Sequence, residues 1–597
     1  MNAHRWNAVL LYGCVSLIGI LSLGKGEIMF IAERLPLKGD RTLSDVPWPM
    51  PEKWSRDNDT FTVLPSSLKF DSNTECDIID DAIRRYRDVI GLFKHDASAD
   101  DSDITKVEIS LGKGTCDEFP YLDMDETYTL VTEMDKVVIS CKTVWGALRG
   151  LETFSQLLFE ESGKVWMRNW NISDKPRFSH RGFMIDTSRH YLPLSIIKKH
   201  LDAMAWSKMN VLHWHIVDAQ SFPFVSTTFP ELSDKGSFTP RHVYKPEDVA
   251  EVIGHARLRG IRVIPEFDTP GHTHSWGKGK PELLTPCWND GEPMRAKYGV
   301  YNKAENFDPT KETTFTFLQQ LMSEVKDVFK DEFIHAGMDE AHYMCWQSSP
   351  NITEFMEEKG FNGSYAKLEE YYVSRALDVI GGTGKNVIMW QDPIDNGVTV
   401  NKSAIVEVWK NKRSNIDCAQ NSVDMWQEFA SHVAKSGNRM IISSCWYLNY
   451  LCYGEDWRRF YACDPHSFTE KQSEKDLVVG GEACLWGEFV DGTNFLQRSW
   501  PRAAAAAERL WSPSHVTDAN TAAFRLDAHR CRLLRRGVPA QPVLPGYCGD
   551  YDYGFEPETP STSEPCGTNG ADTDSVRFAV TTKVLIVLLS LLIATIP

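Results

Sequence analysis

Apolar and polar positions follow two different rhythms along this chain. Between about 45 and 172, helical periodicity at 77–93 and 143–159 is mixed with strand-like alternation at 106–112 and 127–140. Amphipathic helices interleaved with half-buried strands are typical of a small mixed domain. This part of the sequence therefore predicts a compact α+β domain, and no cluster of catalytic residue types stands out in it.

Eight apolar runs follow in the second part of the chain. They lie at 181–188, 210–218, 261–272, 332–340, 386–392, 404–410, 439–449 and 477–488, and amphipathic helical stretches separate several of them. Continuous apolar strands in βα alternation indicate a parallel sheet covered by helices, and eight such strands favour closure. We therefore predict a (β/α)8 TIM barrel at 175–550, preceded by the smaller α+β domain at 45–172.

Both ends of the chain carry segments outside these two domains. Residues 1–25 hold a long apolar run after His4 and Arg5, which predicts a signal peptide, with an uncleaved signal anchor as the alternative. Residues 555–582, rich in Pro, Ser, Thr, Gly and acids, predict a flexible stalk. The short apolar tail at 584–597 fits a GPI-attachment signal; a tail anchor and a disordered end are the alternatives.

Charge and cysteine content narrow the partners and the compartment. A net charge of −18 and the lack of a Lys/Arg-rich block argue against nucleic acid as a partner. Fourteen cysteines indicate the secretory pathway, where disulfides persist. N-glycosylation sequons occur at Asn58, Asn171, Asn351, Asn362 and Asn401. We expect a secreted, lysosomal or cell-surface glycoprotein, and leave a homodimer and a C-terminal lipid anchor open.

Polar and aromatic residues stand where the predicted strands end. The active site of a (β/α)8 barrel lies at the C-terminal ends of its strands, so side chains at these positions are expected to share one site. They are Asp218, His272, Asp339, Glu340, Trp390, Gln391, Trp409, Tyr447, Asn449, Trp486 and Glu488.

Asp339 and Glu340 are adjacent, although like charges repel. A conventional retaining glycosidase needs its two carboxyl groups on opposite sides of the scissile bond, roughly 5–5.5 Å apart, which suits sequence neighbours poorly. A 2-acetamido sugar removes the difficulty, because its own acetamide oxygen can attack the anomeric carbon. One acid would then protonate the leaving oxygen while the other holds the acetamide.

Several long motifs resemble the β-N-acetylhexosaminidases of glycoside hydrolase family 20. They span roughly residues 50 to 550 and read "TVWGALRGLETFSQL", "RGFMIDTSRHYLP", "LHWHIVD", "ARLRGIRVIPEFDTPGHT", "WYLNY", "GGEACLWGE" and "AERLWSP". The resemblance implies a (β/α)8 barrel behind a noncatalytic α+β domain. It also implies an exo-acting, retaining hydrolase of glycans with terminal β-linked N-acetylhexosamine, working without metal or other cofactor.

The same resemblance implies a role for individual residues. Glu340 would be the general acid/base, Asp339 would orient the acetamido nitrogen, and Tyr447 would bond the acetamido oxygen. Asp218 and His272 would tune the proton of the acid. The implied substrate-binding residues are Arg181, Trp390, Trp409, Asn449, Trp486 and Glu488. The implied disulfides are Cys76–Cys116, Cys287–Cys345 and Cys531–Cys548; proximity alone suggests a fourth, Cys452–Cys463.

Three positions depart from the family pattern. Met338 replaces a motif glycine, and its long side chain is expected to crowd the floor of the site. Ala219 follows Asp218 where a second acid is expected. Tyr450 stands where a related subunit active on anionic substrates has arginine, which favours neutral sugars here.

Two other functions stay open at this point. One is a metal-dependent hydrolase with His213 and His215 as ligands, although such a site needs further ligands and the later strands end mainly in tryptophan. The other is a surface carbohydrate-binding protein of the same fold that lost turnover through Met338. Fold alone does not separate a binding protein from an enzyme.

Overall fold

The computed structural model describes residues 39–93, 102–112, 116, 119–289, 291–294, 306–411 and 425–551. The segments predicted at 1–25, 555–582 and 584–597 lie outside these residues. Among the helices that are described, none has both the length and the apolar character to cross a membrane.

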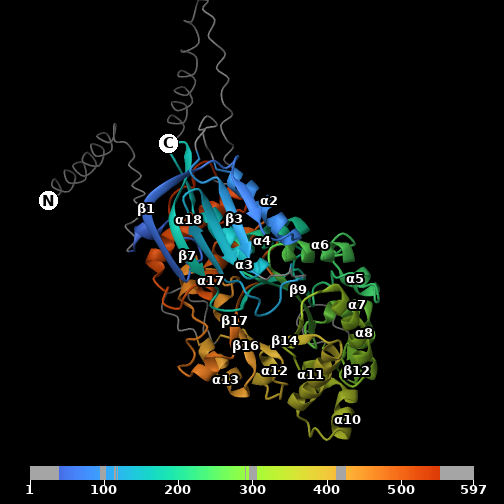
Figure 1. The fold of residues 1–597 in the computed structure, drawn as a ribbon. Coiled ribbons are helices and arrows are strands. Elements are labelled where there is room, and N and C mark those ends of the chain that lie inside the picture. Colours follow the sequence, from blue (N-terminus) through green and yellow to red (C-terminus); the bar gives the residue numbers. More distant parts are fainter. Residues whose placement is uncertain are drawn as a thin grey trace, which may run out of the picture. The chain divides into compact units, whose positions relative to one another are not determined.

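The N-terminal part is a seven-stranded mixed sheet with strand order β1-β7-β4-β5-β3-β2 and β6 paired to β7 (Figure 1). The segment predicted at 127–140 is the antiparallel pair β4–β5, and both predicted helices are present as α2 and α3. The bounds are β1 Lys53–Val63, β2 Lys69–Ser72, α2 Asp77–Gly91, β3 Lys106–Leu111, β4 Tyr128–Thr132, β5 Lys136–Cys141, α3 Val144–Gln156, β6 Leu158–Glu161 and β7 Lys164–Asp174.

The second part is a closed barrel of eight strands in the order β8-β9-β10-β13-β14-β15-β16-β17. All neighbouring strands are parallel, which confirms the predicted (β/α)8 fold. The strands are β8 His180–Asp186, β9 Val211–Val217, β10 Arg262–Thr269, β13 Phe333–Gly337, β14 Asn386–Trp390, β15 Ile405–Val408, β16 Arg439–Ile442 and β17 Val478–Leu485.

Helices of unequal length cover the barrel. The longer ones are α4 Leu194–Trp206, α6 Pro246–Arg257, α8 Glu312–Val328, α11 Tyr365–Gly382, α13 Trp426–Ser436, α17 Arg502–Trp511 and α18 Ala519–Arg535. Short elements fill the loops: η1 Arg41–Leu43, α5 Glu231–Gly236, α7 His274–Gly279, η2 Pro281–Leu283, β11 Cys287–Asn289, β12 Glu292–Met294, α9 Met344–Ser348, α10 Pro350–Glu358, α12 Asp392–Asp395, η4 Ser444–Trp446, α14 Trp457–Ala462, α15 Gln472–Lys475, α16 Phe495–Ser499 and η5 Gly549–Tyr551. Only the short helix α12 lies between β14 and β15, and only η4, α14 and α15 lie between β16 and β17 among the described residues, so these two crossovers lack a long helix.

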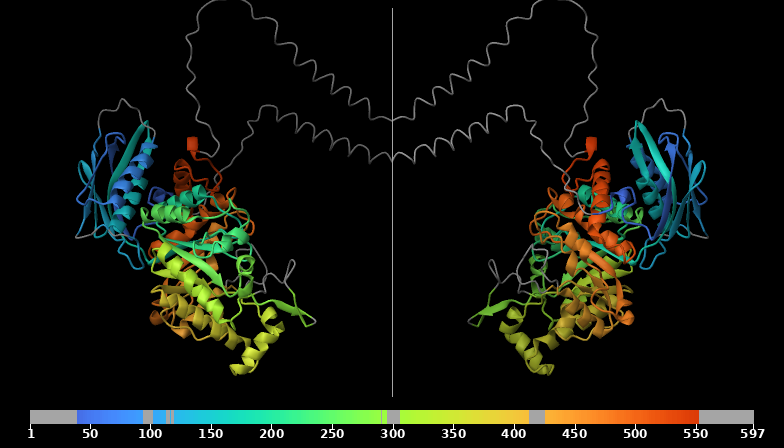
Figure 2. Two further views of the ribbon diagram at one scale, coloured as in Figure 1. Left: turned by 90° about the vertical axis from the view of Figure 1, so that its right-hand side faces the viewer. Right: turned by 90° about the vertical axis from the view of Figure 1, so that its left-hand side faces the viewer.

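Helix α3 is buried along its whole length, and it contacts β4 and β5 of the sheet as well as Gly260 before β10. Figure 2 shows the sheet beside the barrel. Its Arg149 donates a hydrogen bond to the backbone oxygen of Gly260, in the loop before β10, at 3.0 Å. Arg149 also pairs with the buried Glu126 at 2.8 Å. The contact between the two parts is therefore polar as well as apolar.

Four disulfides have both cysteines among the described residues. Cys76–Cys116, Cys287–Cys345 and Cys531–Cys548 form as expected. The expected Cys452–Cys463 pair is wrong, because Cys463 bonds Cys445 instead. Cys445 lies in the short turn η4, so the fold brings it to Cys463 although Cys452 is nearer in sequence.

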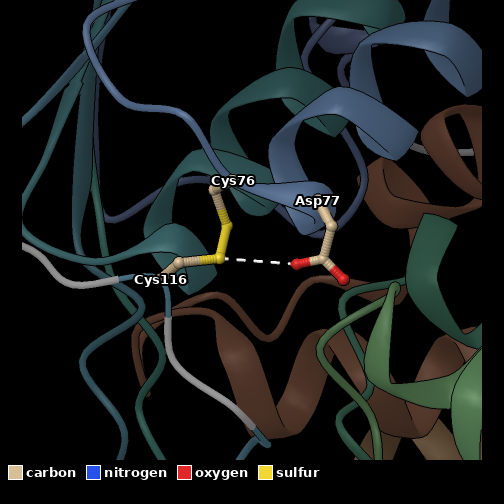
Figure 3. A group of neighbouring side chains, drawn as sticks. All are labelled: Cys76, Asp77 and Cys116. Atoms are coloured by element: carbon tan, nitrogen blue, oxygen red, sulfur yellow. Dashed lines mark hydrogen bonds between the residues drawn. A yellow bond between two sulfur atoms is a disulfide. The ribbon is translucent and has the colours of Figure 1, made fainter.

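The Cys76–Cys116 bridge lies beside Asp77 at the start of α2 (Figure 3). Two sulfurs and a carboxylate at this spacing suggest a metal site, but both sulfurs are already used in the disulfide. Asp77 in turn pairs with Arg257 at 2.5 Å. The group therefore fixes the start of α2 against α6 and holds no ion.

The five sequon asparagines are all exposed: Asn58, Asn171, Asn351, Asn362 and Asn401. Glycosylation at these positions stays a prediction, which the surface position of each side chain permits.

Candidate active site

The two adjacent acids lie on a strained turn directly after β13. Gly337, Met338 and Glu340 have left-handed φ angles of 70°, 74° and 44°. At Gly337 an added Cβ would lie 1.8 Å from the Asp268 carboxylate, so only glycine fits. Left-handed backbone at a non-glycine residue costs about 1–2 kcal/mol, and such strain concentrates at functional sites. The turn therefore fixes Asp339 and Glu340 in one uncommon geometry.

His272, which follows β10, connects the acid pair to Asp218. Its Nε2 lies 3.6 Å from a carboxylate oxygen of Asp339 and 3.5 Å from one of Glu340. Its Nδ1 hydrogen-bonds Asp218 at 3.2 Å. Burial alone would lower the pKa of His272, but the charges of Asp218, Asp268 and Asp339 raise it well above the usual range. A positive imidazolium thus lies between the carboxylates.

Asp339 and Glu340 differ in their surroundings. The Asp339 side chain is 8% exposed and that of Glu340 is 40% exposed. Burial raises the pKa of Asp339 to about 6, even though His272 acts in the opposite direction. Within the described part of the chain, Oδ1 of Asp339 has no hydrogen-bond partner. Asp339 therefore offers a buried acceptor, whereas Glu340 presents its carboxyl group to solvent.

An aromatic cluster is built at the ends of β14 to β17. It consists of Trp390, Trp409, Tyr447 and Trp486, with Met184 and Cys484 below them. Ring centroids are 6.2 Å apart for Trp409 and Tyr447 and 6.4 Å apart for Tyr447 and Trp486. Such rings offer apolar faces together with polar N–H and O–H groups. The cluster suits a ligand that has both C–H faces and polar groups.

Two further predicted residues follow members of this cluster. Asn449 is half-buried, and its Oδ1 has no hydrogen-bond partner among the described residues. Glu488 is exposed, two positions after Trp486. Both lie on loops at the C-terminal ends of strands, as expected, and their contact with a ligand stays a prediction.

The prediction for Arg181 is wrong. Arg181 lies at the N-terminal end of β8, fully buried, and both carboxylate oxygens of Glu126 accept hydrogen bonds from its Nη2 at 2.6 and 2.7 Å. Its other donors bond the backbone oxygens of Lys208 and Phe178. No donor faces the acid pair, so Arg181 holds the two parts of the fold together.

Arg189, after the opposite end of β8, is the arginine at the site. Its Nη2 lies 2.8 Å from Asp218, and its guanidinium stacks over Trp486 at 4.8 Å from the ring centroid. Its Nε has no partner among the described residues. Arg189 belongs to the quoted "RGFMIDTSRHYLP" motif, and its place after the strand was the signal that sequence reasoning missed.

Buried histidines and carboxylates form a chain through the barrel interior. His180 bonds Glu482 at 2.9 Å, Glu482 bonds His213 at 2.6 Å, and Nε2 of His213 lies 3.0 Å from Glu266. Glu266 then bonds His215 at 2.5 Å. Burial alone would lower the pKa of His215, but Glu266 and then Asp218 raise it to about 9. Ionisable groups in contact with one another therefore extend from His180, at the N-terminal end of β8, to Asp218.

These contacts do not favour a metal at His213 and His215. Nδ1 and Nε2 of His215 each bond a carboxylate, and both ring nitrogens of His213 lie within 3.0 Å of one. Asp268, His272 and Asp339 have donor atoms within 4.8 Å of one another. A protonated His272 cannot ligate a cation, so this group fits a proton network better than an ion.

Glu407 on β15 makes the stability of the barrel depend on pH. Burial, followed by the charge of Glu482, raises the pKa of Glu407 from 4.5 to about 7. The folded protein then holds a proton that the unfolded chain releases, so this contribution is complete below pH 4.5 and lost as the pH rises to about 7. We expect the free energy of unfolding to fall, relative to Glu407→Gln, by about 3 kcal/mol over this range. Urea unfolding of both proteins at pH 4.5, 6 and 7.5 would measure this pH dependence. The same change in the free energy of unfolding with pH in both proteins would contradict the prediction.

Met338 does not crowd the site. Its side chain is 1% exposed and belongs to the main hydrophobic core with Ile334 and Ala336, not to the aromatic cluster. Its backbone N–H donates to the Thr269 oxygen at 3.0 Å. The methionine therefore tolerates the glycine-like φ of the turn while its side chain packs away from the acids.

Replacing Met338 tests this assignment. Met338→Gly relieves about 1–2 kcal/mol of backbone strain but removes a buried side chain worth about 2–5 kcal/mol. We expect Met338→Gly to be less stable than the wild type, and Met338→Ala, which keeps the strain, to be no more stable than the glycine variant. Their kcat should stay within about three-fold of the wild type. A large gain in kcat for the glycine variant would contradict the assignment.

Comparisons with known proteins show the family of this chain. Residues 178–514, more than half of the chain, match the catalytic domain of glycosyl hydrolase family 20, and residues 47–157 match the model described as beta-acetyl hexosaminidase like. The beta-hexosaminidase subunit beta of Mus musculus is 48% identical over 79% of this chain and 86% of its own length. The subunit alpha of Rattus norvegicus is 44% identical, over 84% and 94%.

Solved structures share the fold. The chitobiase of Flavobacterium johnsoniae has a TM-score of 0.71 at 28% identity and covers 83% of this chain and 73% of its own. The N-acetyl-beta-hexosaminidase of Streptomyces plicatus, at 22% identity and a TM-score of 0.67, covers 83% and 96% and supports the fold alone. By family match and by identity over most of its length, the chain belongs to glycosyl hydrolase family 20.

Proposed function

We propose that the protein is an exo-β-N-acetylhexosaminidase that releases terminal β-linked N-acetylglucosamine or N-acetylgalactosamine by substrate-assisted catalysis. The observation that carries the proposal is the contrast within one acid pair beside His272. Asp339 is buried with an unpaired oxygen, and Glu340 is accessible. One carboxyl group is thus suited to hold an acetamido N–H and the other to exchange a proton with a leaving group or water.

Two chemical steps follow from this arrangement. First, the acetamido oxygen attacks the anomeric carbon, the bond to the leaving oxygen breaks, and Glu340 gives that oxygen its proton. The resulting oxazolinium ion is steadied by Asp339 and, at its oxygen side, by Tyr447. Second, Glu340 takes a proton from water, which attacks the anomeric carbon from the face that the leaving group vacated. The acetamido oxygen is expelled, and the anomeric configuration is retained.

The test compares p-nitrophenyl 2-acetamido-2-deoxy-β-glucoside with the 2-hydroxy analogue, p-nitrophenyl β-glucoside. The proposal expects turnover of the first and none of the second, because the glucoside lacks the internal nucleophile. Proton NMR of the first sugar released should show the β-anomer. A folded, sugar-binding protein without turnover would support the alternative, a surface carbohydrate-binding protein. Equal turnover of both substrates would contradict substrate assistance.

The proposal also covers the oligomeric state and the cellular compartment of the protein, in outline. The related proteins are named as subunits, which supports testing a homodimer by light scattering. The four disulfides fit an oxidising compartment, so a lysosomal, secreted or cell-surface place is proposed.

Tyr450 stands 40% exposed beside Tyr447. A neutral phenol there supports a preference for neutral over sulfated terminal sugars, measurable as a ratio of kcat/KM.

A further inference from the structure

Asp392 lies between two parts of the site, the turn of the acid pair and the aromatic cluster. It follows Trp390 at the end of β14 and opens the short helix α12 (Figure 1). The side chain is only 8% exposed. Its Oδ2 accepts a hydrogen bond from the indole Nε1 of Trp409 at 2.7 Å, and its Oδ1 accepts one from the backbone N–H of Glu340 at 3.3 Å. One buried carboxylate therefore joins the turn of the acid pair to the aromatic cluster.

Lys410 neutralises this carboxylate. Its Nζ lies 3.0 Å from Asp392 and 2.8 Å from Asp395. Its backbone is held by Gln391, whose side-chain oxygen accepts the N–H groups of Trp409 and Lys410, both at 3.0 Å. The lysine is thus fixed at the end of β15 and shared by two aspartates.

The position of Asp392 matters because the Glu340 backbone is strained. With a φ of 44°, Glu340 needs surrounding contacts to hold it, and the Asp392 hydrogen bond is one of them. The same carboxylate sets the orientation of the Trp409 indole. A shift of about 1 Å at an acid can cost on the order of 100-fold in rate, so contacts of this kind affect turnover without touching the substrate.

The charge of Asp392 also acts on the acid pair. The charged groups that act on Asp339 are His272, Asp268 and Glu266 from β10 and the loop after it, Glu340 after β13 and Asp392 after β14. Burial is the largest cause of its raised pKa, His272 opposes it, and Asp392 is the first of the carboxylates that add to it. A lysine that neutralises Asp392 therefore limits this repulsion.

We propose that Asp392 and Lys410 form a positioning pair for the hydrolase. Asp392 orients Glu340 through its backbone and Trp409 through its indole, and Lys410 pairs with the Asp392 carboxylate and shields Asp339 from its charge. This inference rests on the proposed function, because its readouts are kinetic.

Three single variants separate the two roles. Asp392→Asn keeps the shape but leaves one oxygen to accept two hydrogen bonds, so we expect kcat to fall at least ten-fold with a smaller change in KM. Lys410→Met keeps the aliphatic stem beside Trp409 but removes the ammonium group, and its readout is the pH dependence of kcat/KM. The unshielded Asp392 charge would raise the pKa of Asp339 further, so the acid limb of the kcat/KM profile should move to higher pH. Asp395→Asn is the matched control, because Asp395 bonds Lys410 but neither Glu340 nor Trp409, and its kcat should stay near that of the wild type.

A double variant tests whether the effect of Lys410 depends on the Asp392 carboxylate. In Asp392→Asn/Lys410→Met no carboxylate remains to be shielded, so the shift of the acid limb should disappear while the loss of kcat persists. Thermal unfolding of each protein confirms that it is folded. An active wild type whose folded Asp392→Asn variant keeps full kcat would overturn the inference alone, as would an equal loss in Asp395→Asn. A folded wild type without turnover would overturn the proposed function and this inference with it.

Discussion

Glu340→Gln is expected to lower kcat by about 10²–10⁴-fold, the range that a general acid contributes. The loss should grow as the leaving group becomes poorer, because a poor leaving group depends most on the proton that Glu340 supplies. We therefore expect a larger loss with N,N′-diacetylchitobiose than with the p-nitrophenyl substrate. Asp339→Asn should instead lower kcat by a similar factor on both, since Asp339 acts on the acetamide and not on the leaving oxygen.

Steady-state kinetics of the two variants on the two substrates would check this contrast. Glu358→Gln, an exposed surface position on α10, controls for loss of a carboxylate elsewhere. Binding of N-acetylglucosamine, measured by calorimetry, should survive in Glu340→Gln. If Glu340→Gln cleaves chitobiose as fast as the wild type, the assignment of the acid is wrong. If both variants show the same dependence on leaving group, the division of roles between the two acids is wrong.

The barrel could be predicted from sequence because parallel strands covered by helices are apolar for their whole length. The site residues at the C-terminal rim of the barrel could be predicted. Asp218, His272, Asp339 and Glu340 all lie within three positions after the end of a strand. The buried chain of histidines and carboxylates inside the barrel could not be predicted. Glu266 lies within a strand run, where a polar residue in an apolar sequence gives no sign of which partners the closed barrel brings to it.

Two of the wrong predictions, Arg181 at the ligand and the Cys452–Cys463 disulfide, have a common origin. Arg181 is the second residue of β8, whereas Arg189 follows the end of that strand, and the five steps from Arg181 to Asp186 at about 3.3 Å each span roughly 16 Å. Motif membership placed Arg181 near the ligand, whereas the strand direction places Arg189 there. The disulfide error likewise relied on separation along the chain, although the turn at Cys445 brings that residue to Cys463.

Arg181→Met is expected to destabilise the fold without impairing the site. Arg181 and its partner Glu126 are both buried, and removing one member of a buried ion pair costs about 3–5 kcal/mol because the other charge is left unpaired. Glu126 retains Arg149 at 2.8 Å, which places the expected loss toward the lower end. The protein that remains folded should show an unchanged KM.

Arg189→Met is the matched comparison, because it removes the same group from the other end of β8. Arg189→Met removes the Nε group and the ion pair with Asp218 from the site itself, so kcat/KM should fall at least ten-fold. Urea unfolding and steady-state kinetics on both variants would measure the contrast. A double variant, Arg181→Met/Glu126→Gln, should cost less than the sum of its single changes, because the Arg181–Glu126 ion pair is then lost only once. A raised KM in Arg181→Met at wild-type stability would restore Arg181 to the site and refute the assignment of the interdomain contact.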